Sequence, residues 1–181
     1  MNITFITGNE NKIREAEAIL GIKLNHHNLD LDELQELDPY KISEHKVKQG
    51  WEAIQKPLFV LDQSIYIDCL NGFPGPLIKW FWEKVTLEKI CEIAKYYSNQ
   101  KIYTETLLTY FDGNKVKHFT GRIDGMIPDQ PRGNKGWGWD PIFIPDGQEL
   151  TYSEIDPSEV VNMRSHKIAL EKFRDFIDEQ Q

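Results

Sequence analysis

A few widely separated carboxylates and amines in this 181-residue chain are suited to phosphoryl chemistry. Such chemistry needs a divalent metal, carboxylates that hold it, and cations or backbone amides that take up charge from phosphate oxygens. The candidate carboxylates are Glu33, Glu36 and Asp62. Asp62 is the most informative, because it follows the apolar run 58–61 and ligands of open α/β sheets gather at strand ends. The alternatives are a turn or capping role for Asp62 and a solvated loop for Glu33.

The N-terminal segment has the residue order of an anion-binding turn. An apolar run at 3–6 leads into Thr7, Gly8 and Asn9, and Lys12 lies in the amphipathic stretch that follows. This order predicts a strand, a tight turn and a helix start, where free backbone N–H groups and one lysine can hold an anion. The Walker spacing is absent, and a capped helix after an edge turn would have the same pattern.

Two later segments carry candidates for binding a phosphate and a base. The run 71–76 contains two prolines and two glycines and predicts a stiff turn that would fix Lys79 in the following helix. Lys79 is therefore either a phosphate ligand or a lysine whose stem covers apolar surface. Glycines flank Trp137, so a flat ligand could stack on its indole, whereas we expect Trp139 to pack in the core.

Ser165 and His166 form a third candidate, at the predicted start of the last helix. Their donors could face the edge of a base, although a Ser-His pair at such a position is usually a helix cap. No Gly-x-Ser-x-Gly elbow accompanies the pair, so a hydrolase triad is not indicated.

The elements that must position these residues alternate between strand and helix patterns. Strands are expected at 3–6, 22–29, 58–61 and 65–70, with a hairpin of 102–111 and 115–122. Helices are expected at 11–20, 42–55, 77–83, 86–97 and 165–180. An acidic connection at 30–40 and an ordered loop at 129–150 complete the pattern, which predicts an α/β protein with a mixed sheet.

Length, composition and charge bound the remaining choices. The chain is 40% hydrophobic and 12% aromatic, with a formal net charge of −8. These values predict one globular domain over 1–181, and the acidic balance argues against nucleic acid as a partner. No secretory signal, membrane-spanning run or Cys-x-x-Cys motif is visible, so we expect a cytoplasmic protein without a membrane partner that keeps Cys69 and Cys91 reduced.

Taken together, these segments resemble the inosine triphosphate pyrophosphatase family, the Ham1-like pyrophosphatases of non-standard purine nucleoside triphosphates. The matching segments, in chain order, are 7–12, 30–35, Asp62, 72–81, 138–141, 151–154 and 165–166. The proline-rich turn with Ile-Lys-Trp-Phe and the later Gly-Trp-Asp-Pro are the most specific of them. The resemblance implies an elongated, two-lobed α/β fold with a long mixed β-sheet flanked by helices and a nucleotide cleft between the lobes.

The same resemblance implies a house-cleaning enzyme that hydrolyses ITP, dITP or XTP to the monophosphate and pyrophosphate. It implies a homodimer and a Mg²⁺ cofactor, with Glu33 and Asp62 as metal ligands and Asp62 as the catalytic residue. Residues 7–12 with Lys46 and Lys79 would hold the triphosphate, and Trp137 would stack on the base. The implied substrate-binding residues are Thr7, Gly8, Asn9, Lys12, Lys46, Gln63, Lys79, Trp137, Gly138, Trp139, Asp140, Ser165, His166 and Lys167.

Four positions depart from the family pattern. Leu61 and Gln63 flank Asp62 where the family reads Glu-Asp-Thr or Glu-Asp-Ser, Val161 replaces a lysine, and Lys167 replaces an arginine. The changes remove a carboxylate, a cation and a planar guanidinium fork. Two alternatives therefore stay open: a nucleotide-binding relative with weak or lost turnover, and a pyrophosphatase for other modified nucleotides.

Overall fold

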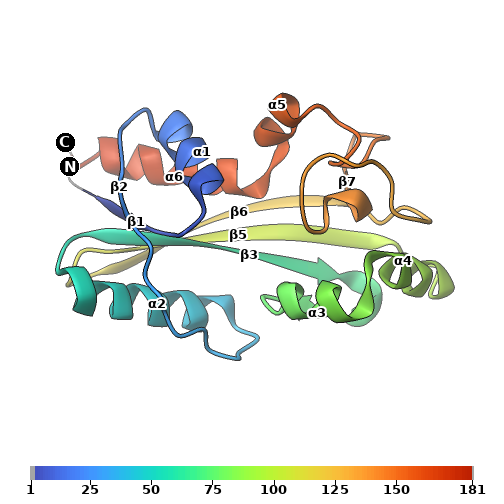
Figure 1. The fold of residues 1–181 in the computed structure, drawn as a ribbon, viewed down its shortest axis with the longest axis horizontal. Coiled ribbons are helices and arrows are strands. Elements are labelled where there is room, and N and C mark those ends of the chain that lie inside the picture. The colour runs from blue at the N-terminus through green and yellow to red at the C-terminus, as the bar shows by residue number, and fades with distance from the viewer. Residues whose placement is uncertain (1–2, 181) are drawn as a thin grey trace. The chain divides into compact units, whose positions relative to one another are not determined.

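The computed structural model describes residues 3–180, which fall into two compact units (Figure 1). Unit 1 comprises residues 3–63, 106–121 and 166–180, and unit 2 comprises residues 64–105 and 122–165. Three long strands, β3 (Leu58–Ile67), β5 (Lys101–Phe111) and β6 (Val116–Met126), contribute residues to both units. That the whole chain is one domain stays a prediction.

The sheet is mixed, as the alternation of elements predicts. Among the described residues, seven strands form it in the order β2-β1-β3-β5-β6-β7, with β4 paired to β3. β1 (Thr4–Ile6) runs parallel to β2 (Asn25–His27) and to β3. β4 (Pro74–Gly75) and β7 (Ile144–Pro145) are antiparallel to β3 and β6. The predicted α/β class with a mixed sheet is therefore confirmed.

Unit 1 packs helices on both faces of its strands (Figure 1). α1 (Glu10–Leu20) and α6 (Ser165–Asp178) cover one face, and α2 (Pro39–Ile54) covers the other. Successive β3 residues alternate between the faces, so Phe59 and Leu61 join the α1 and α6 core, while Leu58 and Val60 pack with Val47 of α2.

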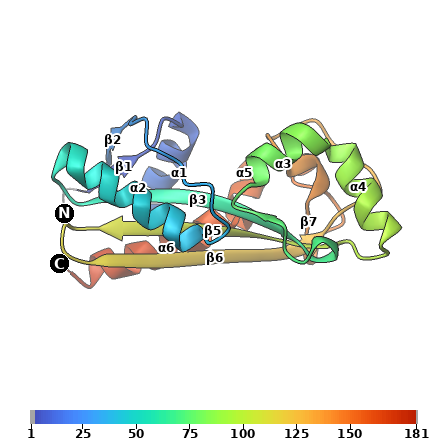
Figure 2. The same cartoon turned by 90° about the horizontal axis from the view of Figure 1, so that it is seen from below.

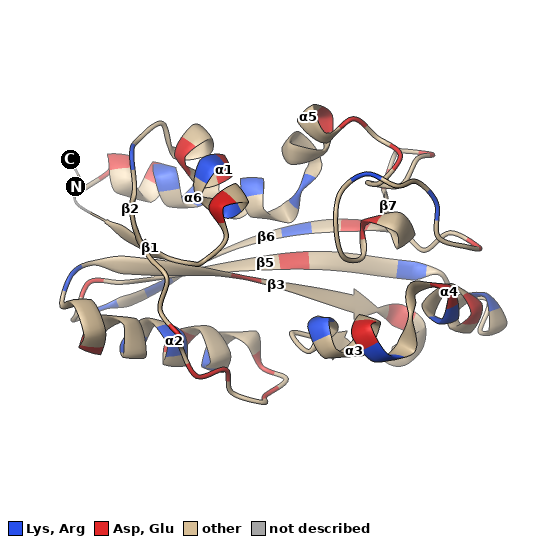
Figure 3. Cartoon of the chain, in the orientation of Figure 1, with Lys and Arg blue, Asp and Glu red and all other residues tan. Residues whose placement is uncertain are grey.

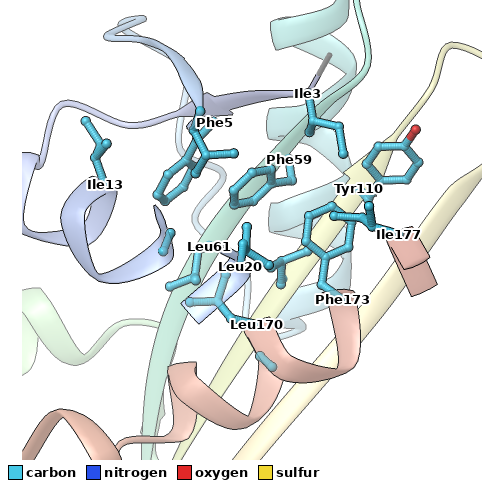
Figure 4. Packing of buried hydrophobic residues seen from close by; sticks show 14 residues of the cluster. Ile3, Phe5, Ile13, Leu20, Phe59, Leu61, Tyr110, Leu170, Phe173 and Ile177 are labelled. Carbon is cyan, nitrogen blue, oxygen red and sulfur yellow. The ribbon is translucent and has the colours of Figure 1, made fainter. Parts of the chain in front are cut away.

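Closely packed aromatic rings form the centre of the unit 1 core. In Figure 4, Phe59 lies between Phe5 of β1 and Phe173 of α6. The ring centroids of Phe5 and Phe59 are 4.4 Å apart, and those of Phe59 and Phe173 are 5.1 Å apart. All three side chains are fully buried, which anchors α6 and β1 to the strand that carries Asp62.

Unit 2 buries one face of its strands beneath helices and a long loop. α3 (Ile78–Val85) and α4 (Leu87–Tyr96) follow one another along the same side of this unit, as Figure 2 shows. Ile65 and Ile67 of β3 belong to the same core cluster as Ile90 of α4 and as Trp139 and Tyr152. The predicted ordered loop thus supplies core side chains, and it contains η2 (Asp140–Ile142) and β7; α5 (Pro157–Val160) and η3 (Val161–Met163) come later in this unit.

Some element boundaries differ from those expected. β3 is one continuous strand, so Asp62 and Gln63 lie inside it, and the expectation that Asp62 follows a strand end is wrong. The polar pair interrupts the apolar pattern without ending the ladder, because both side chains are only half-buried and burial resumes at Ser64. α2 starts at Pro39, earlier than expected, because the Asp38 side chain accepts a hydrogen bond from the Tyr40 amide and caps the helix.

Candidate active site

The turn between β1 and α1 is stabilised by its own side chains. Thr7 Oγ1 accepts a hydrogen bond from the Asn9 amide at 3.1 Å, and Asn9 Oδ1 accepts from the Asn11 and Lys12 amides at 3.0 and 3.3 Å. These amides are therefore not free, contrary to the expectation for this helix start, because Asn9 acts as its N-cap. An anion binding here would have to displace the cap.

Gly8 allows a close approach within the same turn. A Cβ atom at Gly8 would lie 2.6 Å from Oδ1 of Asn28, which follows β2. Any larger residue would therefore require the Asn28 side chain to move away from the turn.

Lys12 directs its amine from α1 toward β3. Its Nζ donates a hydrogen bond to the Leu61 carbonyl at 3.2 Å. Burial lowers the pKa of Lys12, and the attraction of the neighbouring Asp62 carboxylate offsets only part of that effect. The predicted phosphate-binding lysine thus lies beside the predicted catalytic aspartate.

Lys46 of α2 joins the two carboxylates that the sequence singled out. Its Nζ donates to Asp62 Oδ1 at 2.7 Å and to Glu33 Oε1 at 2.9 Å. Burial works against the charge on Lys46, but attraction to Asp62 and the hydrogen bonds to both carboxylates outweigh it, so the pKa of Lys46 is raised. Three residues far apart in sequence therefore form one ion-pair cluster in unit 1, hereafter the Lys46 cluster.

The Lys46 cluster is only partly shielded from water. The exposed fractions of the side chains are 12% for Lys46, 23% for Asp62 and 61% for Glu33. Figure 3 shows the setting: acidic residues gather in the segment that leads into α2, and basic residues lie on α2 itself. Solvent therefore reaches Glu33 and part of the Asp62 side chain.

The donor set of the Lys46 cluster fits a magnesium ion. Asp62 Oδ2 is buried and accepts no hydrogen bond from any described residue, which leaves one carboxylate oxygen with its coordinating capacity unused. Mg²⁺ is usually held by one or two carboxylates, with water and substrate phosphates as its other ligands. Within 3–180 no group of three or more His, Cys, Asp or Glu side chains is placed to hold a metal ion. Glu33 and Asp62 are the two carboxylates that could do so together with a phosphate.

His166 and Lys167 lie in the first turn of α6, within unit 1. The buried His166 ring has its Nε2 3.0 Å from a carboxylate oxygen of Glu15 on α1. Lys167 lies 3.9 Å from Glu171, one helical turn further along. The contacts expected between a base and His166 or Lys167 stay a prediction.

In unit 2, the loop around Trp137 is folded tightly against a buried ion pair. Trp137 is 50% exposed, and its amide donates to Asp140 Oδ2 at 3.0 Å. Asp140 is fully buried and accepts two hydrogen bonds from Arg164, at 3.0 and 2.7 Å. Trp139 is 3% exposed within the core, which confirms the expected packing role, and Gly138 between the tryptophans has a φ of +61°.

Lys79 and Ser165 also lie in unit 2. Lys79 is exposed on α3, with its Nζ 5.3 Å from the ring centroid of Trp80. In the preceding turn, Pro74 and Gly75 pair with β3, and the stiffness expected of this turn stays a prediction. Ser165 is buried at the start of α6, with its Oγ 3.4 Å from the hydroxyl of Thr104. The binding roles expected of Lys79 and Ser165 stay predictions.

The predicted site residues thus divide between the two units. Unit 1 holds Thr7, Gly8, Asn9, Lys12, Glu33, Lys46, Asp62, Gln63, His166 and Lys167. Unit 2 holds Lys79, Trp137, Gly138, Trp139, Asp140 and Ser165. The structure brings Lys12, Lys46, Glu33 and Asp62 together in unit 1, and Trp137 and Asp140 in unit 2.

Sequence reasoning gave no firm role to Arg164, which is 6% exposed and pairs with Asp140. In the sequence, Arg164 is a single arginine next to Ser165 and His166, and it lies 24 residues from Asp140, so nothing nearby indicates that the two residues pair. Its burial could not be read from that spacing.

Comparisons with known proteins identify relatives over almost the full length. A family model described as the Ham1 family matches residues 3–176. The chain is 34% identical to a dITP/XTP pyrophosphatase of Methanopyrus kandleri, covering 97% of this chain and 96% of the relative. It is 38% identical to an inosine triphosphate pyrophosphatase of Candida glabrata, with the same coverage of both chains.

Solved structures share the fold. The Ham1 protein of Staphylococcus aureus superposes with a TM-score of 0.84 at 18% identity, covering 99% of this chain and 100% of that chain. A Ham1 protein from Coxiella burnetii has a TM-score of 0.79 at 22% identity, with 98% of each chain covered. Separately, none of the helices in the described part of the chain has the length and apolar character required to cross a bilayer.

Proposed function

This chain belongs to the Ham1 family, and from that premise we propose that it is a nucleoside triphosphate pyrophosphatase. The family resemblance found in the sequence is confirmed by the matching model and by the relatives. The proposed reaction converts ITP, dITP or XTP into the monophosphate and pyrophosphate, which removes non-standard purines from the nucleotide pool. Relatives named for activity on inosine triphosphate or on dITP and XTP support this choice of substrate.

The Lys46 cluster is the observation that carries the proposal. A structural ion pair needs one carboxylate for one amine, whereas Lys46 is bound by both Glu33 and Asp62. The buried second oxygen of Asp62 accepts no hydrogen bond from the described residues. Excess acidic capacity beside two lysines suits a polyanion that arrives with a divalent cation.

In the proposed mechanism, Glu33 and Asp62 are the residues that would hold Mg²⁺. When bound, the ion would polarise phosphate oxygens and offset the charge of the leaving pyrophosphate. Asp62 orients the attacking water toward the α-phosphorus and accepts its proton, while Lys12 and Lys46 stabilise the negative charge that develops on the phosphate oxygens. Positioning and electrostatics supply the catalysis, so no covalent enzyme intermediate is required.

The base end of the substrate would be recognised by stacking and by donors. Trp137 would stack on the purine, and His166 and Lys167 would donate toward the 6-oxo group of hypoxanthine or xanthine. Adenine has an amino group at this position, so the donors of His166 and Lys167 would face another donor. Sites that hydrogen-bond a required group reject its absence by about 10⁴-fold or more, which gives the proposed selectivity against ATP a physical basis.

A pyrophosphate-release assay on the purified protein tests the proposal directly. The panel contains ITP, dITP, XTP, GTP and ATP, each with Mg²⁺ and with excess chelator. We expect release from the 6-oxo, non-standard nucleotides to exceed release from ATP by orders of magnitude and to stop with chelator. Release that is equal for ATP and ITP, or indifferent to chelator, contradicts the proposal.

Two alternatives have specific observations in their favour. Leu61 is buried in the unit 1 core, so the family's carboxylate beside Asp62 is replaced here by a packing side chain, which favours a binding protein with weak turnover. Binding of ITP without pyrophosphate release would support that reading. The half-buried Gln63, and Lys167 in place of the family's arginine, favour a different modified nucleotide as substrate. Adding dUTP and methylated nucleotides to the panel would identify that substrate.

We further propose that the protein acts as a homodimer in the cytoplasm. The homodimer rests on the family resemblance, and the compartment is supported by two free cysteines, Cys69 and Cys91, which a reducing environment would keep unpaired. Sedimentation equilibrium over a range of concentrations measures the oligomeric state, and a single monomeric species throughout contradicts the first part.

A further inference from the structure

We propose that Arg164 is a positioning residue that holds Trp137 as a fixed stacking platform for the base, an inference that rests on the proposed function. Arg164 has no place in the family motifs found in the sequence. Its side chain is 6% exposed, so it does not itself offer a cation to solvent. Its effect on a ligand would therefore be exerted through the residues that it contacts.

Arg164 is tied to the backbone of Trp137 through Asp140. Its two terminal nitrogens donate to the two oxygens of Asp140 at 3.0 and 2.7 Å, the bidentate arrangement that only a guanidinium makes. Asp140 Oδ2 also accepts the Trp137 amide at 3.0 Å. The ion pair thus holds the backbone of Trp137 in place, from which the indole extends.

Arg164 also contacts the rings on either side of this network. Its guanidinium carbon lies 5.5 Å from the Trp137 ring centroid and 5.1 Å from that of Tyr152. Tyr152 is 1% exposed, and its hydroxyl donates to the Met163 carbonyl at 2.6 Å, directly before Arg164 in the chain. The guanidinium therefore links a rigid core ring to a half-exposed one.

The loop is built around this carboxylate. Gly136 has a φ of +75°, and a Cβ atom there would lie 2.2 Å from Asp140 Oδ2. A side chain at this position would expel the carboxylate, so the backbone passes as close to Asp140 as it can. Trp137 itself is 50% exposed, so part of its ring faces solvent while its backbone is held by Asp140.

Stacking does not read the edge of a base, because every base has a π-face. Loosening Trp137 should therefore weaken all base-carrying ligands alike and leave the phosphate contacts intact. The test compares Arg164→Lys, which keeps the charge but loses the planar fork, with Arg122→Lys as a matched control. Arg122 pairs with Asp124 and stacks on Tyr103, but it is exposed.

For R164K we expect KM for ITP to rise about tenfold with kcat changed less than about twofold, as expected when binding but not chemistry is affected. KM for GTP should rise by the same factor, and inhibition by inorganic tripolyphosphate, which has no base, should be unchanged. R122K should match the wild type throughout. An unchanged KM in R164K, or parallel losses for ITP and tripolyphosphate, overturns the proposal.

Fluorescence provides a second readout that needs no turnover. The Trp137 emission is obtained as the difference between each protein and its W137F version, and we expect it in R164K to shift to the red and to be quenched more strongly by acrylamide. If the wild type proves inactive on every nucleotide, the proposed function fails, and an unchanged Trp137 signal would separately overturn the positioning role.

Should R164K fail to fold, the double variant R164M/D140L replaces both charges by apolar side chains and leaves no unpaired buried charge. A folded double variant that loses the Trp137 signature supports the proposal, and one that keeps both the signature and the wild-type KM contradicts it.

Discussion

Each unit of the molecule contains a short ion pair to an aspartate, and the two pairs differ in what they leave unpaired. In unit 2, Asp140 is fully buried, and Arg164 together with the Trp137 amide supplies hydrogen bonds to both of its oxygens. In unit 1, Asp62 is 23% exposed, and the oxygen that does not meet Lys46 accepts no hydrogen bond from the described residues. Both oxygens of Asp140 are therefore hydrogen-bonded, whereas only one oxygen of Asp62 is.

The difference separates a structural ion pair from a candidate for catalysis. A satisfied buried pair specifies one local conformation and has no capacity left for a ligand. A buried carboxylate oxygen that accepts no hydrogen bond costs stability unless a cation arrives, and native structures rarely retain such groups without a use. Breaking the first pair should therefore change folding, and breaking the second should change turnover.

The largest effect is expected from Asp62→Asn, which removes the charge but keeps the shape. Pyrophosphate release should fall by about a thousandfold, the usual loss for a group that stabilises the transition state. The unfolding free energy should hardly change, because Lys46 still pairs with Glu33. Steady-state kinetics and urea denaturation measure the two quantities. Asp175→Asn, an exposed change on α6, serves as the control, and near-normal turnover of D62N would show that Asp62 is not catalytic.

The opposite balance is expected for Asp140→Ala, which leaves Arg164 buried without its partner. Unfolding should become easier by about 3–5 kcal/mol, the typical cost of an uncompensated buried charge. Asp124→Ala breaks an exposed pair with Arg122 and should cost about 1 kcal/mol or less. Urea denaturation of both variants makes the comparison, and equal losses would mean that the buried pair stabilises no more than a surface one.

If the Lys46 cluster holds Mg²⁺, the ion should stabilise the folded protein through that cluster. At about 100 times its dissociation constant, a ligand that binds only the folded state adds about 2.7 kcal/mol to the unfolding free energy. The gain should shrink in Glu33→Gln and persist in Glu36→Gln, a neighbouring carboxylate that instead accepts the Leu37 amide. Denaturation with and without Mg²⁺ measures the gain. Equal gains in both variants would place the ion elsewhere.

A smaller effect is expected from Val161→Lys, which restores a cation that the family pattern has at this position. One added charge near a polyanion should lower KM for ITP by about three- to tenfold, less so at high salt. Val161→Met adds bulk without charge and controls for packing. If V161K and V161M behave alike, the position contributes no electrostatic attraction in this protein.

Much of the fold could be predicted from local patterns. The hairpin of β5 and β6, the amphipathic α1 and the C-terminal α6 follow from period and turn residues alone. The continuity of β3 could not be predicted, because polar residues at 62 and 63 read as a break. Only the sheet pairing, which is a long-range property, shows that the strand continues through them.

The candidate site could be predicted in its residue types but not in its pairings. Glu33, Lys46 and Asp62 were each expected to act on phosphate or metal, yet their shared contact depends on three elements meeting. The pairing of Arg164 with Asp140 is equally invisible in a single sequence. The pattern at 7–12 fits a capped helix as well as an anion-binding turn, and in the structure the Asn9 side chain caps the helix.

The alternation along β3 links the chemistry of this protein to its core. Leu58, Val60 and Asp62 fall on the strand face that meets α2, while Phe59 and Leu61 fall on the face that meets α1 and α6. A one-residue insertion before Asp62 would place Leu61 next to the Lys46 amine, and a one-residue deletion would bring Asp62 to the face that carries Phe59 and Leu61. Evolution can therefore retune this strand by replacing residues, but any change in its length would remove activity and stability in a single step.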